Sequence, residues 1–430
     1  MSKKLILINP PSPWLISDKD MPPMGILYLA SYLREKKIDV HVTDLSGLEE
    51  KDWKIPDADI YGISCVTPQF HIVQQITAIL RHRQKKALII LGGFHPSSVP
   101  EETLNKTESN LVVKGEGEEA LESICNSNQY SHEDKKIIVN SKLIQDINLP
   151  FPARDLIDIY AYQRVKTKTS GDAKVESVLI SSRGCPYKCS YCAQGVISQN
   201  RVRFRSIVDL GQEVRALVDR YDTDRFYLLD DTFNISEKRV MEICDMFLSL
   251  AKDIKRVDWH CVARTDLVTD DSLCRMSEAG CIRITYGIES GSSKILKFNE
   301  KRTTPKSNHE GISKALKHNI EVRAQMIVGL PGETDETIEE TAEFIRRYPE
   351  VIWGFHIFVP LPGSPVWNTP ERFHFKLNNI HCYQYYQTLG KPDSWDASLV
   401  HQNPEQIKFW VEYLRNIPGS RHAFQLSNKA

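Results

Sequence analysis

The chain has 430 residues, 41% of them hydrophobic, which is enough for two ordinary domains, each with its own core. Its 55 Lys and Arg residues nearly balance its 56 Asp and Glu residues, and the formal net charge of -1 argues against a nucleic-acid-binding protein. The apolar run at residues 5–8 is too short for a signal peptide and no stretch approaches the ~18 apolar residues of a membrane span, so we expect a cytoplasmic protein with no membrane partner.

The first third of the chain alternates short apolar runs with helical segments. The predicted strands or strand-containing segments are residues 5–9, 40–45, 60–66, 87–93 and 111–121, with helices at 25–36 and 71–84. This rhythm is typical of a parallel sheet covered on both faces, so residues 1–145 are predicted to form a Rossmann-like or flavodoxin-like α/β domain. Ligands of such sheets bind beyond the carboxyl ends of the strands, here residues 10–14, 67–70, 92–98 and 115–118.

A second series of strands and helices begins after residues 146–175, whose prolines and polar residues indicate a linker. Its predicted strands are residues 176–182, 225–230, 257–263, 281–288, 322–329 and 352–359. The clearest helix is 206–221, where Ser206 and Asp209 have the spacing of a capping box. Six such units predict a partial (β/α)6 barrel of the TIM type over residues 176–368, followed by a short helical cap at 369–430.

Polar residues follow the predicted barrel strands, on the face where barrels carry their active sites. They are Asp230, Asp231, Arg264, Glu289, Glu333 and the turn at residues 360–365. Three cysteines follow the first barrel strand, Cys185, Cys189 and Cys192, in a C-x3-C-x2-C spacing. Structural zinc would need a fourth ligand and usually two pairs, but the later cysteines are scattered. A four-iron, four-sulfur (4Fe-4S) cluster held by three thiolates instead leaves one iron open, so these three residues are predicted to be metal ligands and catalytic.

The cysteine segment CPYKCSYC resembles the cluster motif of the radical S-adenosylmethionine (SAM) superfamily, with Tyr191 as the aromatic residue before the last cysteine. In that family SAM chelates the open iron and is cleaved to a 5'-deoxyadenosyl radical. GIESGS at residues 287–292 resembles the fourth-strand segment, in which Glu289 and Ser290 would contact SAM. MIVGLPGET at 326–334 resembles the fifth-strand motif, whose backbone near Ile327 would pair with adenine.

LLDDTF at residues 228–233 occupies the place where many relatives carry Gly-Gly-Glu. Asp230 and Asp231 therefore depart from the majority pattern, but the pair is similar to that of the cobalamin-binding branch. We assign both, with Tyr191 and Arg264, to cofactor binding.

Four N-terminal segments together resemble the cobalamin domain of that branch: INPP, PPMGILYLASYL, LGGFHPSS and VVKGEGEEAL. The cofactor-binding residues that this resemblance implies are Thr67, Gly92, Gly93, His95, Gly115, Glu116 and Gly117. Asp39, His41 and Asp44 resemble the D-x-H-x-x-G motif that supplies a histidine to cobalt, but the glycine is absent and the segment is predicted to be a strand. We therefore expect cobalamin to bind without a histidine lower ligand.

The resemblance implies three cofactors, a 4Fe-4S cluster, SAM and cobalamin, and an external one-electron reductant of the flavodoxin or ferredoxin type. The main hypothesis is a methyltransferase acting on an unactivated carbon, or phosphorus, of a small-molecule biosynthetic intermediate. A radical rearrangement, cyclisation or ring contraction with the same cofactors is the alternative, and a cobalamin-binding sensor without catalysis is the second alternative. The sequence does not distinguish methyl transfer from rearrangement.

Overall fold

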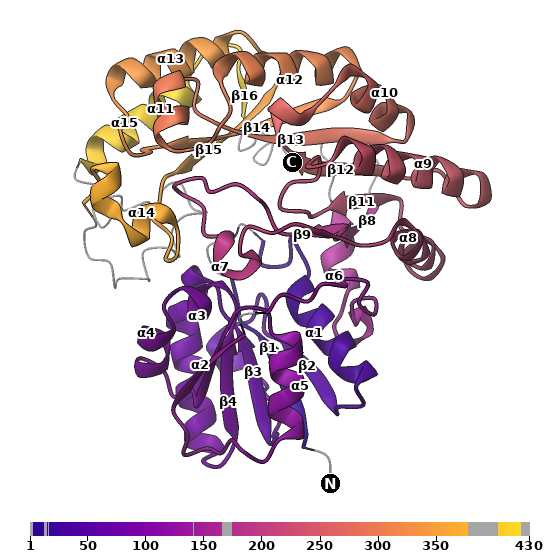
Figure 1. Cartoon of the computed structure of the whole chain (residues 1–430), viewed down its shortest axis with the longest axis vertical. Helices are drawn as coiled ribbons and strands as arrows, with labels where there is room; N and C mark the ends of the chain where they lie inside the picture. The colour runs from indigo at the N-terminus through magenta and orange to yellow at the C-terminus, as the bar shows by residue number, and fades with distance from the viewer. Residues whose placement is uncertain are drawn as a thin grey trace.

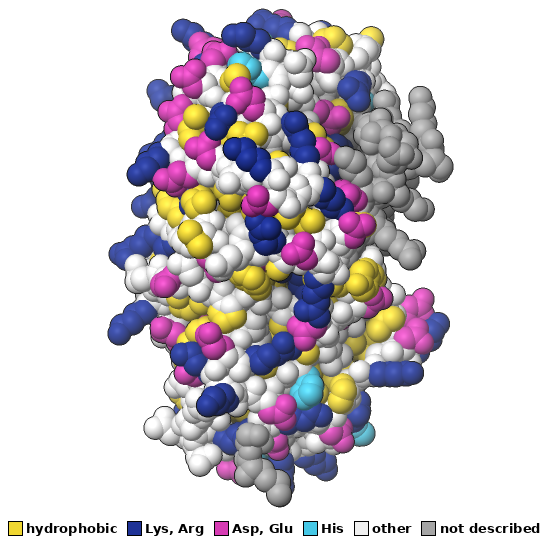
Figure 2. Space-filling view, turned by 90° about the vertical axis from the view of Figure 1, so that its right-hand side faces the viewer, with side chains coloured by type: hydrophobic (Ala, Val, Ile, Leu, Met, Phe, Trp, Pro, Cys, Tyr) yellow, Lys and Arg dark blue, Asp and Glu magenta, His cyan; other side chains and the backbone are white. Residues whose placement is uncertain are grey.

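The computed structural model describes residues 3–12, 15, 17–140, 142–165, 174–376 and 403–422. Two α/β units lie one above the other, the N-terminal unit in indigo and purple and the second unit in magenta to yellow (Figure 1). Basic and acidic side chains are interspersed over the face drawn in Figure 2, in keeping with the near-zero net charge. Within the described residues, no helix combines the length and the hydropathy needed to cross a membrane.

The N-terminal unit is built on one parallel sheet in the order β2-β1-β3-β4-β5-β6. Its strands are β1 (Leu5–Asn9), β2 (Val40–Asp44), β3 (Ile60–Ser64), β4 (Leu88–Gly92), β5 (Leu111–Lys114) and β6 (Lys136–Val139). The central strands are apolar along their length because helices cover both faces of the sheet. The order reverses between β1 and β3, which is the flavodoxin-like arrangement and marks a ligand-binding edge.

The helices of this unit are α1 (Met24–Glu35), α2 (Phe70–Arg83), α3 (Phe94–Ser98), α4 (Pro100–Asn105) and α5 (Glu118–Asn126). Helix α1 buries a stripe that includes Ile26, Leu27 and Leu33, and α5 packs beside it. The expected strands and both expected helices are confirmed to within a few residues. Strand β6 was not predicted, because it is an edge strand with exposed ends and little apolar pattern.

The second unit contains the predicted partial barrel. Its six strands are β8 (Lys174–Leu179), β11 (Arg225–Leu228), β12 (Asp258–Ala263), β13 (Cys281–Glu289), β14 (Glu321–Val328) and β15 (Ile352–Ile357). All six are parallel and hydrogen-bonded in chain order. The outer helices α8 (Ile207–Tyr221), α9 (Glu237–Asp253), α10 (Asp270–Glu278), α12 (Pro305–Lys317) and α13 (Asp335–Arg346) bury the largest hydrophobic core against them. Ser206 caps α8 by accepting a hydrogen bond from the Asp209 backbone.

Both ends of the barrel sheet extend beyond the six predicted strands. Strand β7 (Arg164–Val165) pairs antiparallel with β8, and β16 (Arg421–His422) pairs parallel with β15. Helix α15 (Pro404–Arg415) packs on α13 beside the outer helices, where Trp410 donates a hydrogen bond to Asp335 at 2.7 Å. Within the expected helical cap, residues 403–422 are therefore a helix and a strand that continue the barrel. Cys382 lies outside the described residues, and the domain boundaries remain predictions.

Buried charges join the N-terminal unit to the barrel. Arg205 donates to the Tyr28 hydroxyl at 3.1 Å and pairs with Glu213, which also pairs with Arg154 at 2.7 Å. Arg154 donates to the Val178 carbonyl of the first barrel strand at 2.8 Å. Each of these charged side chains has partners, as buried charges require. The network therefore ties α1, the connecting segment and the barrel together.

Candidate active site between the two units

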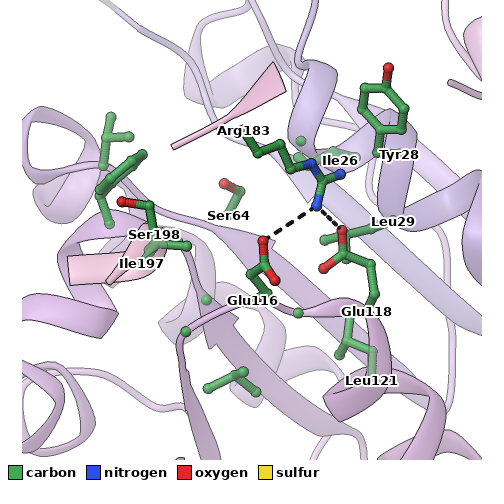
Figure 3. Close-up of a pocket in the computed structure, with 18 of the residues that line it drawn as sticks. Ile26, Tyr28, Leu29, Ser64, Glu116, Glu118, Leu121, Arg183, Ile197 and Ser198 are labelled. Carbon is green, nitrogen blue, oxygen red and sulfur yellow. Dashed lines mark hydrogen bonds and ion pairs between the residues drawn. The ribbon is translucent and has the colours of Figure 1, made fainter. Parts of the chain in front are cut away.

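A cavity of about 1340 Å³, open solvent included, lies between the N-terminal sheet and the barrel. The N-terminal side consists of the carboxyl ends of β3, β4 and β5 with parts of α1 and α5. The barrel side consists of β9 (Ser182–Arg183), α7 (Gly195–Ser198) and β10 (Arg203–Phe204) with Leu229 and Asp231. Figure 3 shows Arg183 reaching across this cavity toward Glu116 and Glu118.

Five of the seven N-terminal residues predicted to bind a cofactor line this cavity: Gly92, Gly93, Gly115, Glu116 and Gly117. Thr67 and His95 are not among the lining residues. His95 is fully buried, with its Nδ1 3.3 Å from the Thr67 hydroxyl and its ring 4.2 Å from that of Phe70. Burial lowers the pKa of His95 to about 3, so the imidazole is neutral. Both residues therefore support the loop behind the cavity wall, and their contact with cobalamin stays a prediction.

The glycines at the strand ends have different reasons to be glycine. Gly93 has a φ of 103°, and a Cβ there would lie 2.8 Å from the Cys65 carbonyl oxygen. Gly115 has a φ of 105°, and its Cβ would lie 2.4 Å from the Asn140 oxygen. A Cβ on Gly92 would meet nothing within 4 Å, because it would enter open space at the cavity wall. The fold requires the first two glycines, and the third keeps space clear.

The cavity fits a broad and largely uncharged ligand such as a corrinoid. Its N-terminal floor is apolar, with Leu7, Ile26, Ile90, Val113 and Leu121, and glycines form its rim. No histidine is among the described residues that line it. His41 lies on β2, is about half exposed and pairs with Asp39 at 3.1 Å. Cobalamin without a histidine lower ligand remains a prediction.

The three cysteines lie on one loop between β9 and α7, and the aspartates after β11 anchor its start. Asp231 accepts hydrogen bonds from the Gly184 backbone at 2.8 Å and from the Gln194 side chain at 2.6 Å. Asp230 is buried and accepts four hydrogen bonds, from the backbone and the hydroxyl of both Ser181 and Ser182. Asp230 therefore positions the loop, and its contact with SAM stays a prediction.

Contacts from the barrel hold the middle of the cysteine loop. The Ser190 backbone and hydroxyl donate to Asn299 at 3.0 and 2.7 Å. The Arg264 guanidinium lies 3.7 Å from the centre of the Tyr187 ring and is held by Asp266 at 2.9 Å. Arg264 also donates a hydrogen bond to the Lys301 carbonyl at 3.1 Å, so it links the stacked Tyr187 of the loop to the segment that carries Lys301.

The loop also has the features expected of a cluster site. Cys189 is buried, Cys185 is partly buried and Cys192 is exposed. Burial raises the pKa of the Cys189 thiol, and the charges of Lys301 and Arg264 act in the opposite direction. Within the described residues, no three His, Cys, Asp or Glu side chains converge on a point suited to a single metal ion. Three thiols on one constrained loop, with cations beside them, fit thiolate ligation of an iron–sulfur cluster.

Glu289 ends β13 in a strained conformation next to the cysteine loop. Its φ is 67°, and the pairing of β13 with β14 shifts register between Gly287 and Glu289. The Glu289 carboxylate accepts a hydrogen bond from the Lys301 ammonium at 2.8 Å, and both side chains are nine-tenths buried. A non-glycine residue with positive φ in a bulge is a recurring feature of functional sites.

The three other barrel residues of the prediction divide between the site and the core. Ile327 and Tyr191 pack on one apolar cluster that includes Leu330 and Phe358, consistent with a shared wall. Ser290 is fully buried, where its hydroxyl lies 3.2 Å from that of Thr341 on α13. Ser290 therefore secures the turn after β13, and its contact with SAM stays a prediction.

Sequence reasoning missed four charged residues at the site: Arg183, Arg203, Glu118 and Lys301. Arg203 forms two hydrogen bonds with the Glu116 carboxylate, both at 2.8 Å, and Arg183 donates to Glu118 at 2.7 Å. Each partner of these pairs comes from a different unit. No local sequence pattern indicates these pairs strongly, because arginine and glutamate are common and the partners are far apart in the sequence.

Comparisons with known proteins agree with this geometry. Residues 17–125 match the B12 binding domain, and residues 179–345 match the radical SAM superfamily. An uncharacterized methyltransferase from Pyrococcus horikoshii is 29% identical over 390 residues, which cover 85% of this chain and 82% of the relative. The anaerobic magnesium-protoporphyrin IX monomethyl ester cyclase of Rubrivivax gelatinosus is 26% identical, over 87% of this chain and 71% of the relative.

Among solved structures, the radical SAM methyltransferase TsrM from Kitasatospora setae, with cobalamin and an iron–sulfur cluster bound, has a similar fold. Its TM-score is 0.71 at 16% identity, over 85% of this chain and 77% of that chain. The two domain matches cover the two halves of the cavity described above. The chain is therefore a cobalamin-binding member of the radical SAM superfamily, an enzyme class that uses cobalamin, a 4Fe-4S cluster and SAM.

Proposed function

We propose that this enzyme transfers a methyl group to an unactivated carbon, or to phosphorus, of a small-molecule biosynthetic intermediate. The observation that carries the proposal is that the cysteine loop borders the apolar cavity between the two units. Gly184 and Gln194, which flank the three cysteines, line it together with Gly92 and Gly117. Two cofactors that act on one substrate must lie close together, and this arrangement allows it.

In this proposal the cysteines hold the cluster, and the chain's other residues position the reactants. When bound, the cluster and SAM supply a carbon-centred radical, and cobalamin supplies the methyl group. Glu289, fixed by Lys301, offers a buried carboxylate to the ribose or amine of SAM. Ile327 and Tyr191 offer an apolar wall for the adenosyl group. Asp231 and Arg264 keep the cysteine loop in place.

Two partners belong to the proposal. SAM cleavage consumes one electron, so we include an external reductant of the flavodoxin or ferredoxin type. The substrate is a small molecule, as in the TsrM structure that carries tryptophan and a SAM analogue at a TM-score of 0.70.

The cyclase among the relatives supports a second candidate, a radical cyclisation or rearrangement with the same cofactors. A cobalamin sensor without catalysis is less well supported, because a sensor has no use for a cysteine loop braced by Asp231 and Arg264.

The test is anaerobic reconstitution with iron, sulfide and hydroxocobalamin, followed by incubation of cell metabolites with deuteromethyl SAM and a strong reductant. A product that gains one labelled methyl group supports methyl transfer. Formation of 5'-deoxyadenosine with an altered but unlabelled product would favour cyclisation or rearrangement. Absence of 5'-deoxyadenosine from the fully reconstituted protein would contradict both enzyme proposals and favour the sensor.

A further inference from the structure

Arg183 extends from the barrel into the cavity, two residues before Cys185. It lies on β9, where its register partner on β10 is Arg203. Strands β9 and β10 thus form a short two-stranded ribbon, from which both arginines face the glutamates of the N-terminal unit. Figure 3 shows the Arg183 guanidinium above Glu116 and Glu118, with Tyr28 beside it.

The two arginines have different surroundings. Arg203 is buried, and two of its nitrogens bind the Glu116 carboxylate while one also donates to the Ile144 carbonyl at 2.6 Å. Arg183 is 20% exposed, and its one hydrogen bond to a described residue joins Nη1 to Glu118 at 2.7 Å. Its Nη1 is 3.6 Å from Glu116, and its guanidinium is 5.2 Å from the centre of the Tyr28 ring.

The spare donors of Arg183 have an obvious class of partner in this cavity. A guanidinium has several N–H donors in a planar fork, and most of those on Arg183 have no acceptor among the described residues. The cavity floor beyond it is apolar and supplies few acceptors. The rim of a corrinoid ring carries carboxamide side chains, whose carbonyl oxygens accept hydrogen bonds.

We propose that Arg183 binds the corrinoid from the barrel side, by donating to carboxamide carbonyls on the rim of the ring. Glu118 and Tyr28 hold the guanidinium in the cavity for this contact. The inference rests on the proposed function, because it requires the cavity to bind cobalamin. It goes beyond that function by placing a residue of the radical SAM unit in the cobalamin site.

The contact also links the two cofactor sites. Gly184 follows Arg183, its backbone is held by Asp231, and Cys185 comes next. Gly184 has a φ of 98°, and a Cβ there would lie 2.0 Å from the Arg201 carbonyl oxygen, so this segment has little freedom to adjust. A corrinoid held by Arg183 is therefore held at a set distance from the start of the cysteine loop.

The test compares Arg183→Gln with one control variant of the full chain, Arg201→Gln, using hydroxocobalamin and cobinamide as ligands. Cobinamide has the corrin ring and its carboxamides but lacks the nucleotide tail. Arg201→Gln removes an exposed charge from the same segment, and its side chain does not line the cavity. Binding is measured by anaerobic absorbance titration, and thermal unfolding without ligand reports the fold.

Arg183→Gln should weaken the binding of both ligands by about tenfold or more, since it removes charged hydrogen bonds. Arg201→Gln should bind both ligands like the wild type. Wild-type affinity in Arg183→Gln would overturn the proposal. So would a loss of affinity that comes with an equally marked fall in the Tm of the ligand-free variant, which would indicate a clamp between the units, or a loss confined to hydroxocobalamin, which would indicate a tail contact. Failure of the wild type to bind hydroxocobalamin would instead contradict the proposed function.

Discussion

The two walls of the cavity use opposite means to bind their cofactors. The N-terminal wall consists of apolar side chains and glycines, and at Gly92 the useful property is the space left by a missing side chain. The barrel wall carries charged groups beside the cysteine loop, and partners such as Asp231 and Lys301 hold that loop and Glu289 in place. A broad macrocycle is selected by shape and free space, whereas iron and SAM need donor atoms at set positions.

The difference has a consequence for substitutions. On the barrel side, a change of one atom in a donor removes a bond to a cofactor. On the N-terminal side, a change matters when it adds volume to the cavity or when it breaks a turn that the fold requires. Substitutions on the two sides should therefore differ in whether they reduce SAM binding, cobalamin binding or folding stability.

The largest expected effect follows replacement of Cys185, Cys189 and Cys192 together by Ala. Without thiolate ligands the cluster cannot form, so iron content and 5'-deoxyadenosine formation should both be lost. Hydroxocobalamin should still bind within about twofold of wild type, because none of the three cysteines lines the cavity. Iron analysis, product chromatography and absorbance titration make the comparison. SAM cleavage by the triple variant would disprove the cluster assignment.

Gly92→Val and Gly93→Val should differ in kind. Val at position 92 fits an extended strand end and fills open cavity space, so cobalamin binding should fall by at least about tenfold with little change in Tm. Val at position 93 would have to adopt a positive φ and would contact the Cys65 carbonyl. The substitution should therefore lower the folding stability by about 2 kcal/mol or more. Calorimetry and cobalamin titration of both variants distinguish the two. The comparison fails if Gly92→Val binds cobalamin like the wild type.

Glu289→Gln should act only on the barrel side. The amide can still accept the Lys301 hydrogen bond, but the charge offered to SAM is lost, at a cost of ~1.5 to 3 kcal/mol, or about ten- to a hundredfold in affinity. Cobalamin binding should not change. Equilibrium binding of SAM to the reconstituted protein measures the effect, and unchanged SAM affinity would remove Glu289 from the site.

His41→Ala is expected to have no effect on cobalamin. The side chain is about half exposed on β2 and does not line the cavity. The affinity for hydroxocobalamin and the electron paramagnetic resonance spectrum of bound cob(II)alamin should match those of the wild type, without nitrogen superhyperfine splitting. Splitting that disappears in the variant would identify His41 as a lower ligand and contradict the assignment of the N-terminal wall.

Most strands and the cluster loop could be predicted because their signals are local. Each central strand is a short apolar run, and the three cysteines lie within eight residues. The missed strands β6 and β16 are short edge strands, and edge strands carry little apolar pattern. For Asp230 and Ser290, the sequence indicated a place in the site but not which atoms each side chain would contact.

By itself, then, the sequence determined the two α/β units, the ligand-binding edge of each and the three cysteines, since these depend on residues close together in the chain. Only the tertiary structure decided that the two edges share one cavity, and which polar residues face it. The Arg183–Glu118 pair spans 65 residues and joins two units, so no local pattern could predict it. The same holds for the glycines, because whether a missing side chain serves the fold or leaves space for a ligand depends on what lies opposite in three dimensions.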